Sequence, residues 1–448
     1  MKIAYRHLVE NIHEKPSIDE ISDRLFQLGH EHEIENHVFN MEFTPNRGDC
    51  LSIKGLLRDL AVFYKINLAQ DIHTKKIDPL SLDFENLSPD VCPKITFLKL
   101  EIDEVPKEYN QLLSNYFKDL GINKNNFFAD VSNYISYETG QPTHCFDATK
   151  ITNKIIFQEL DLHNNKFETL LDKKITLSKK NAVFSMNNSI ISLAGVVGGK
   201  STSCDIDTKT VLIECAYFQP EAIIGKSVKY DIQSEASYKF ERGVDPDCHE
   251  KVLRRLIKIV SDHANIKDMS IVSYSADIDY EHKIPIDLDK INKIIGINIT
   301  QNNYENILLK LGFSIESGSI NVPSFRSDIR TNNDLAEEVA RVIGYNNIKL
   351  SDIDIPKNQN NSSNDIAEKL RYFLIDNGFY EVINSPFVSY KSEAAIDALK
   401  VDNPLDSSRE YLRKNLTQSL LKNLLFNEKR QKDSVKLFEI ADIYYSNN

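Results

Sequence analysis

The N-terminal segment shows the polar and apolar spacing of a helix that is capped at both ends. Ser17 and Glu20 have the spacing of a capping box, and the apolar residues that follow recur at helical intervals as far as Gly29. A second helix is predicted to begin at Ser52, with a strand end and turn over 43–48 before it. This pattern predicts a small α+β unit over residues 1–73.

A polar, proline-interrupted stretch at 74–92 is interpreted as a linker, and the pattern changes at Lys94. Apolar Leu98, Leu100 and Ile102 alternate with charged residues, which is typical of a half-buried strand. Short strands, helices and glycine-rich turns follow, and the region closes with an apolar helical stripe over 252–260. We expect a central mixed α/β domain over 94–270.

The remaining chain predicts two further domains, so that the fold class is multidomain α+β. In 280–350, two short helices end at Gly296 and Gly312, a strand surrounds Val322, and a third helix ends at Gly344. This is the outline of a small helix-rich module with a β wing. An Asn/Ser-rich linker at 357–364 leads into a last domain over 362–448, which opens with a helix ended by Gly378.

Composition narrows the class of protein. Of 448 residues, 41% are hydrophobic and 27% charged, as in a soluble globular protein, and no apolar run is long enough to cross a bilayer. The N-terminus lacks a signal-peptide pattern, so we expect a cytoplasmic protein without a membrane partner. Six scattered cysteines without a CxxC pair disfavour zinc knuckles and disulfides. A net charge of −12 means that RNA would have to be met by local basic patches or by another subunit.

Seven motifs carry a resemblance to a known family, and they occur in the same order as in that family. The motifs are PNRGDCLSIKGLLRDLAVFY (45–64), DVSNYISYETGQPTHCFD (130–147), LAGVVGGKS (193–201), DTKTVLIECAYFQPEAI (207–223), SEASYKFERGVDPD (234–247), VPSFRSDIRTNNDLAEEVARVIGYNNI (322–348) and VDNPLDSSREYLRKNL (401–416). The resemblance covers nearly the whole chain and is to bacterial phenylalanyl-tRNA synthetase β chains.

The resemblance implies a subunit of phenylalanine–tRNA ligase in an α2β2 heterotetramer. The α subunit would bind ATP and phenylalanine and would share Mg²⁺ with this chain, and tRNA(Phe) would be the RNA partner. Family members usually carry an oligonucleotide-binding-fold domain before the PNR motif, but residues 33–42 leave space only for a turn. The family also continues to an anticodon-binding module, so the class II synthetase-like antiparallel-sheet domain at 362–448 is expected to be a noncatalytic and incomplete copy.

The resemblance places a hydrolytic editing site in the central domain. A hydrophobic pocket that accepts phenylalanine rejects tyrosine only weakly, so a second pocket that hydrolyses Tyr-tRNA(Phe) is useful. His144 and Glu214 are polar groups that could hold a phenol hydroxyl or a water, although an isolated His is more often structural. The implied pocket residues beside them are Ser132, Asn133, Ala194, Gly195, Ser234 and Ala236, with threonine common in the family at 132 and 234.

An acidic cluster precedes and opens the third helix of the 280–350 module. Asn332 or Asn333 would cap this helix, so that the acids of its first turn are neighbours. One or two acids are explained by the helix dipole, but four would repel one another unless a Mg²⁺ ion neutralised them. Replacing some of them by neutral isosteres should then leave the isolated chain equally or more stable. The same positions resemble the family's Mg²⁺ site, namely Asp328, Asp334, Glu337 and Glu338.

The C-terminal motif leaves room for two interpretations. Arg409 and Arg413 could hold ATP phosphates, but an interface scaffold is favoured because the domain resembles a degenerate catalytic copy, and no GxxxxGKS or GxGxxG loop occurs in the chain. Two other functions compete with an obligatory β subunit. One is a free-standing hydrolase that clears Tyr-tRNA(Phe), and the other is a nonenzymatic RNA-binding or scaffold paralogue.

Overall fold

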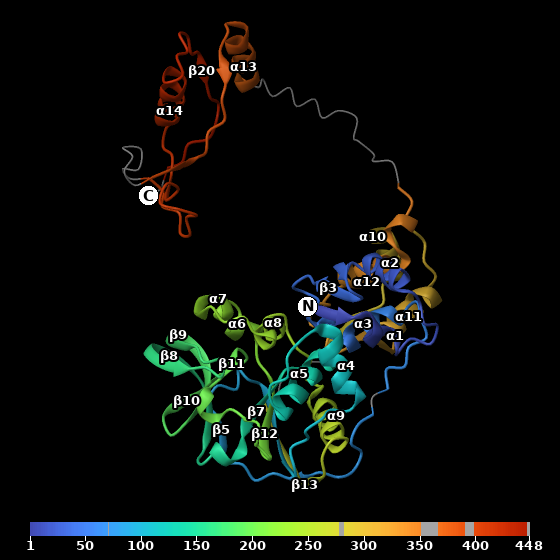
Figure 1. Cartoon of the computed structure of the whole chain (residues 1–448). Helices are drawn as coiled ribbons and strands as arrows, with labels where there is room; N and C mark the ends of the chain where they lie inside the picture. The colour runs from blue at the N-terminus through green and yellow to red at the C-terminus, as the bar shows by residue number, and fades with distance from the viewer. Residues whose placement is uncertain (70, 277–281, 351–365, 390–397, 446–448) are drawn as a thin grey trace. The chain divides into compact units, whose positions relative to one another are not determined.

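The computed structural model describes residues 1–69, 71–276, 282–350, 366–389 and 398–445. The chain divides into two compact units, Met1–Leu350 and Ser351–Asn448 (Figure 1). Mixed helices and sheets make up both, as expected for an α+β chain. Within the described ranges, no helix is both long and apolar enough to cross a membrane.

The N-terminal helices form where the sequence predicts them. The hydroxyl of Ser17 accepts from the backbone N–H of Glu20, whose carboxylate accepts from the N–H of Ser17, so the predicted capping box is confirmed. Strands β2 and β3 are joined directly through Asn36 and His37, both with positive φ, which leaves no inserted domain between them. The elements are β1 (Lys2–Ala4), α1 (Tyr5–Val9), α2 (Ile18–Gln27), β2 (Glu31–Glu35), β3 (Val38–Glu42) and α3 (Ile53–Leu60), with the strands in the order β1-β3-β2.

Two five-stranded sheets face each other in the central region (Figure 1). The first has the order β4 (Asp78–Pro79), β13 (Ile266–Ser275), β6 (Lys94–Ile102), β12 (Thr210–Tyr217), β7 (Thr143–Asp147). The second has the order β11 (Val197–Gly198), β10 (Ser189–Leu193), β9 (Lys174–Met186), β8 (Ile155–Glu168), β5 (Phe84–Asn86). Strands β4 and β5 lie in the segment interpreted as a linker. That interpretation was wrong, because each sheet offers a free edge whose backbone groups pair with even a short polar segment.

The middle of the first sheet is buried on both faces. Leu98 and Leu100 of β6 pack toward the helical side, whereas Phe97 packs toward the second sheet. The strand predicted to be half-buried is therefore buried on both sides in its first half. The other helices of this region are α4 (Gln111–Leu120), α5 (Phe127–Thr139), α6 (Pro220–Ile223), α7 (Lys226–Tyr230), α8 (Glu235–Phe240) and α9 (His249–Ser261), with single 3₁₀ turns at Gly48–Cys50, Ala148–Lys150 and Lys200–Thr202.

The segment after β13 forms the predicted helices and β wing. Gly296 ends α10 in a left-handed conformation, as expected. The cap of α12 differs from the prediction, because Thr331, and not Asn332 or Asn333, accepts the first free N–H, while Asp334 completes the capping box. The elements are β14 (His282–Pro285), α10 (Leu288–Ile295), α11 (Gln301–Lys310), β15 (Ser314–Glu316), β16 (Ser319–Val322), α12 (Asn332–Ile343) and a 3₁₀ turn at Tyr345–Asn347, with the sheet order β14-β16-β15.

The second unit contains two helices and two small sheets in its described part. Helix α13 is the predicted opening helix, and Gly378 follows it with positive φ. The linker predicted at 357–364 lies outside the described residues. The elements are α13 (Ile366–Asp376), β17 (Tyr380–Glu381), β18 (Phe387–Val388), β19 (Tyr411–Leu412), α14 (Thr417–Glu428) and β20 (Leu437–Phe438), in which β17 pairs with β20 and β18 with β19.

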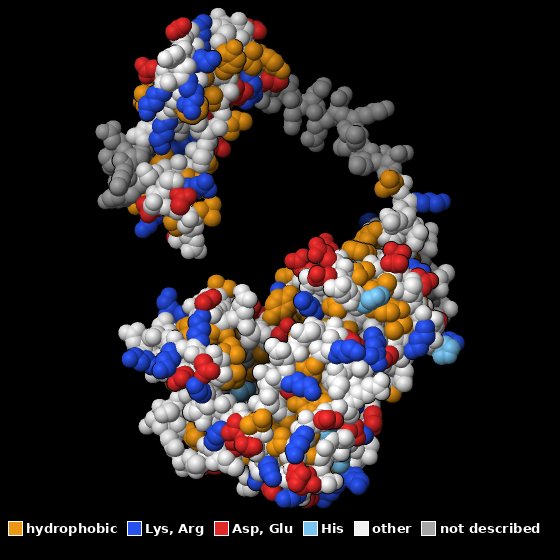
Figure 2. Space-filling view, in the orientation of Figure 1, with side chains coloured by type: hydrophobic (Ala, Val, Ile, Leu, Met, Phe, Trp, Pro, Cys, Tyr) orange, Lys and Arg blue, Asp and Glu red, His pale blue; other side chains and the backbone are white. Residues whose placement is uncertain are grey.

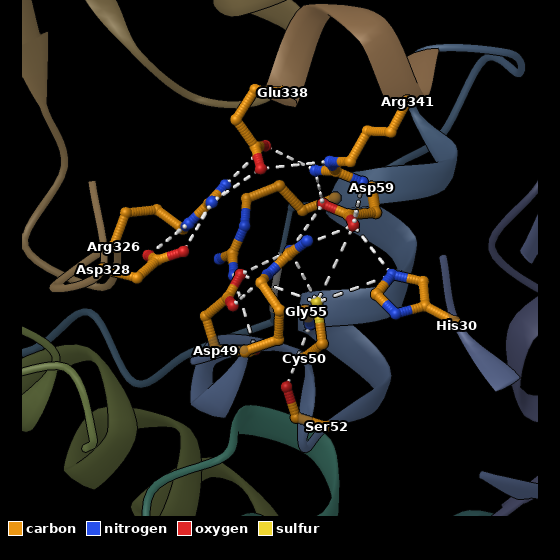
Figure 3. A network of polar contacts seen from close by, with 12 residues as sticks. His30, Asp49, Cys50, Ser52, Gly55, Asp59, Arg326, Asp328, Glu338 and Arg341 are labelled. Carbon is orange, nitrogen blue, oxygen red and sulfur yellow. Dashed lines mark hydrogen bonds and ion pairs between the residues drawn. The ribbon is translucent and has the colours of Figure 1, made fainter. Parts of the chain in front are cut away.

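A buried ladder of alternating charges joins the N-terminal residues 1–73 to helix α12 (Figure 3). Arg341 binds Glu338 and, at 2.8 Å, Asp59 on α3. Arg47 extends the ladder from Asp59 to Asp49, with contacts of 3.0 and 2.9 Å. On the other side of Glu338, the ladder continues through Arg326. Its guanidinium lies 2.7 Å from Glu338 and 2.9 Å from Asp328. Each buried charge is therefore neutralised by a neighbour of opposite sign.

Removal of one member of this ladder should destabilise the protein. Burial alone would raise the pKa of Glu338, but Arg341 and Arg326 hold it down to about 2. Glu338→Gln would remove the carboxylate shared by Arg326 and Arg341 and leave the buried ladder with an uncompensated positive charge, at a cost of about 3–5 kcal/mol. The adjacent and exposed Glu337 provides the control, since Glu337→Gln should change stability by less than about 0.5 kcal/mol. Denaturant unfolding at neutral pH measures both, and equal midpoints for the two variants would show that the ladder is not stabilising.

Candidate functional site

One cavity of about 300 Å³ gathers most of the residues expected at the editing site. It lies beside the end of β7 and is closed by the 192–198 turn and by α8. Two expected members, Ser132 and Ala194, do not line it, because their side chains are buried behind its wall. The expected residues that do line it are Asn133, His144, Gly195, Glu214, Ser234 and Ala236.

Strand pairing brings the two polar candidates together. Glu214 on β12 lies directly opposite His144 on β7 in the antiparallel register. Directly opposed residues point to the same face of a sheet, and alternate residues share that face. Leu212 and Phe146, two positions away on their strands, belong to the core between the sheets. Glu214 and His144 therefore point into the space between the two sheets.

The carboxyl group of Glu214 is buried without a partner. The side chain is 5% exposed, and none of the described residues donates a hydrogen bond to it. Burial raises its pKa to about 8, because a carboxylate removed from water loses its solvation. At neutral pH the group is consequently a carboxylic acid, which can donate one hydrogen bond as well as accept others.

His144 is held in a comparable state. Its Nε2 atom is shielded from solvent and finds no hydrogen-bond partner in the described part of the chain. Burial lowers the pKa of the imidazole to about 4, so the ring is neutral at neutral pH. Gly198 makes room for this ring, since a Cβ at that position would lie 2.2 Å from His144 Cε1. Phe146 packs edge-on at 4.4 Å, which fixes the ring plane.

Hydroxyl groups hold the walls of the cavity in place. Ser234 caps α8 and donates to the carbonyl oxygen of Val196 at 2.7 Å, which ties the helix carrying Ala236 to the opposite turn. Ser132 donates to the carbonyl oxygen of Thr143 at 2.7 Å and so joins α5 to β7. These two serines shape the cavity rather than present free hydroxyls to a ligand.

Sequence reasoning missed the apolar part of the lining. Leu170 and Leu171 line the cavity from the β8–β9 turn, and Phe240 lines it from the end of α8. Leu171 is 57% exposed, although apolar side chains in a turn usually find cover. Two leucines in the otherwise polar turn TLLDKK were a signal for these residues.

The acidic cluster has a different arrangement from the one predicted. Glu338 is 3% exposed, and its oxygens accept from Arg326 and Arg341, while Asp328 is paired with Arg326. Asp334 accepts from the N–H groups of Arg330 and Thr331. The expected repulsion is therefore relieved by arginines and backbone donors, and only Glu337 points its charge to solvent without a recorded partner in the described chain. These four residues do not fit a magnesium ion in this arrangement.

A second group of possible metal ligands lies in the charge ladder. Ligand atoms of His30, Cys50 and Asp59 lie within 4.8 Å of one another (Figure 3). Arg47 Nη2 lies 2.8 Å from Cys50 Sγ and 3.0 Å from Asp59 Oδ2. A guanidinium nitrogen already serves as the cation between these two groups, so the cluster is structural.

The C-terminal arginines are engaged within the second unit. Arg413 is 3% exposed and donates to Glu439 at 2.8 Å, and Arg409 lies 3.5 Å from Asp406. A buried guanidinium bound to a carboxylate is not free to hold a phosphate. This geometry supports the scaffold interpretation.

Three domain families match consecutive parts of the chain. They are the B3/4 domain over residues 95–265, the tRNA synthetase B5 domain over 284–345, and the phenylalanyl tRNA synthetase beta chain CLM domain over 348–448. The two sheets and the cavity lie largely in the first of these ranges.

Relatives named phenylalanine–tRNA ligase beta subunit match along the chain. That of Ehrlichia canis is 30% identical over 461 residues, covering 100% of this chain and 57% of the relative. That of Psychrobacter arcticus is 28% identical, covering 91% and 53%. An N-terminal fragment of the Pyrococcus horikoshii β subunit overlaps at a TM-score of 0.42 and 15% identity, covering 76% of this chain and 99% of the fragment, which is too low to add to the assignment. The chain thus spans about half the length of its curated relatives, and it belongs to the family of phenylalanine–tRNA ligase β subunits.

Proposed function

We propose that this chain is the β subunit of a cytoplasmic phenylalanine–tRNA ligase and that its cavity hydrolyses Tyr-tRNA(Phe). The synthetic site, with ATP and Mg²⁺, would belong to an α subunit in an α2β2 complex that charges tRNA(Phe). The single observation that carries the editing proposal is the pair of buried, neutral and unpartnered polar groups, Glu214 and His144, in one small cavity.

Such a pair selects a ligand that carries a hydroxyl. A phenol donates one hydrogen bond and accepts another, and the neutral His144 and the protonated Glu214 offer one acceptor and one donor. A phenylalanyl ring would leave both groups unpaired, and a site built for a hydroxyl rejects the ligand without it by large factors. The cavity would therefore discriminate in the direction opposite to a synthetic site for phenylalanine.

The protein would act by positioning a water and the ester and not by covalent catalysis. The turn 194–198, with Gly195 at positive φ, brings backbone close to the cavity. A water held there beside the ester carbonyl would attack it, and tyrosine and uncharged tRNA would be released. We place no nucleophilic side chain in this step.

Substitution of Glu214 or His144 should separate editing from charging. Glu214→Ala and His144→Ala should each slow hydrolysis of Tyr-tRNA(Phe) by roughly 5- to 150-fold, which corresponds to the loss of about 1–3 kcal/mol. Glu214→Gln retains a donor and should lose less. Phenylalanylation by the complex with α should be nearly unchanged, because the two pockets are separate.

Deacylation of purified Tyr-tRNA(Phe) by complexes containing each β variant measures these effects. Glu316→Ala, at an exposed position of β15, is the control. Full hydrolytic activity in the Glu214 and His144 variants would remove the editing function from this cavity and leave a structural β subunit.

The pKa of Glu214 predicts a pH-dependent stability. The folded chain retains a proton up to about pH 8, whereas the unfolded chain releases it near 4.5, so stability is lost as pH rises between these values. Glu214→Gln cannot ionise and escapes this loss. Its stability relative to wild type should therefore increase with pH across this window, by at most about 1.4 kcal/mol per unit. Unfolding at several pH values tests this, and a difference that does not vary with pH would mean that Glu214 is ionised in the folded chain.

The arginine contacts of the second unit predict that this chain has no synthetic activity of its own. Because Arg413 is bound to Glu439, the chain alone should not form phenylalanyl adenylate. Phenylalanine-dependent exchange of pyrophosphate into ATP should stay at background for the purified chain and appear once α is added. Exchange by the β chain alone would refute the scaffold interpretation of Arg409 and Arg413.

A further inference from the structure

Four lysines gather beside the cavity in a chain whose net charge is −12. Lys179 and Lys180 lie on β9, at the irregular part of its pairing with β8, and Lys226 and Lys229 lie one turn apart on α7. We refer to these four residues as the lysine rim. Figure 2 shows Lys and Arg side chains over this region of β8, β9 and α7.

Two lysines of the rim, Lys226 and Lys229, are held in place by hydrogen bonds to β9. The ammonium group of Lys226 donates to the carbonyl oxygen of Lys180, and that of Lys229 donates to the carbonyl oxygen of Ser178. Tyr230 adds a hydrogen bond of 3.0 Å to the same carbonyl of Ser178. Because the two acceptors are two residues apart, the ammonium groups are ordered side by side before any ligand arrives, which lowers the entropy cost of binding.

Little negative charge opposes the rim. In the described chain, Glu159 lies 3.3 Å from Lys180, whose side chain is 73% exposed, and this is the one ion pair recorded for the four lysines. Burial and the charge of Lys229 both lower the pKa of Lys226. Two neighbouring acids already have partners, since Asp231 binds Lys173 and Asp172 binds Lys200, and Asp161 lies opposite Lys180 in the strand pairing. The rim thus carries cationic charge that is free to meet an anion.

The position of the rim connects it to the cavity. Helix α7 ends at Tyr230, and the cavity lining begins again at Gln233. Gln233 is four positions after Lys229, a span of at most about 14 Å. An aminoacyl group in the cavity would be attached to the 3′ end of an RNA strand, so the last phosphates of that strand would lie within this range.

We propose that the lysine rim binds the phosphate backbone of the RNA strand whose aminoacylated 3′ end enters the cavity. This inference rests on the editing function proposed above and assigns the residues that hold its substrate. An acidic membrane is the less suitable anion. The exposed apolar side chains next to Lys226 and Lys229 are Ile224, which precedes α7, and Val228 on this five-residue helix, and they are too small a surface for stable insertion.

The test is the salt dependence of tRNA binding. Uncharged tRNA(Phe) transcript is titrated with the full chain in complex with α at several salt concentrations from about 50 to 200 mM. In Lys226→Gln/Lys229→Gln, the slope of log K against log salt should become shallower by about 1.4–1.8, and binding should weaken by roughly tenfold. Lys226→Arg/Lys229→Arg should restore both, because backbone phosphates require charge at these positions.

The control is Lys290→Gln/Lys293→Gln, which removes two exposed lysines with the same spacing from α10. It should leave slope and affinity unchanged. The inference is overturned if the rim variant keeps the wild-type slope, or if it loses binding to phosphatidylserine vesicles while tRNA binding is unchanged.

Glu214→Ala separates this inference from the editing proposal. It should bind tRNA with the wild-type slope and affinity while losing deacylation. If Glu214→Ala retains deacylation while the rim variant has a shallower salt dependence of tRNA binding, the editing proposal fails and the proposed RNA-binding role of the rim is retained. If the rim variant keeps the wild-type salt dependence of tRNA binding while Glu214→Ala loses deacylation, the inference about the rim fails and the editing proposal is retained.

Discussion

The buried charge ladder is the constraint on which the first unit depends. It joins residues 47–59 to residues 326–341, so that the N-terminal residues 1–73 and α12 cannot separate without exposing unpaired charges. Gly48, inside the same segment, approaches the backbone of Arg242 and Gly243 so closely that a Cβ there would lie 2.5 Å from a carbonyl oxygen. The ladder therefore also fixes the segment that leads into α9, which covers one face of the first sheet.

Two glutamates of this chain show how environment decides the role of a residue. Glu338 and Glu214 are both almost fully buried. Glu338 is surrounded by guanidinium groups and its pKa lies at about 2, whereas Glu214 has apolar neighbours and its pKa lies at about 8. The first is a permanent anion that contributes to stability. The second is a neutral acid that costs stability at high pH and is available to a ligand, which is the usual condition of a functional group.

The net charge of the chain does not describe its local charge distribution. The ladder balances its charges internally, and Asp231 and Asp172 are paired with Lys173 and Lys200. The lysine rim, whose helix α7 precedes the cavity residue Gln233, is a cationic surface on a chain of net charge −12. A polyanion would thus be attracted to this edge and repelled by much of the remaining surface.

The sequence by itself determined the local elements and the family. Capping residues, helical spacing and glycine stops depend on neighbours within about five positions, so both ends of α2, the start of α3 and the end of α10 were predicted. It also indicated Glu214 and His144, but only through resemblance, because residues 70 positions apart meet through strand pairing. The tertiary structure alone decided the protonation states, the arginine partners of Glu338 and Asp328, and the pairing of β4 and β5. Each of these depends on which distant segment supplies the neighbouring charge, the apolar cover or the free strand edge, and local spacing carries no information on that.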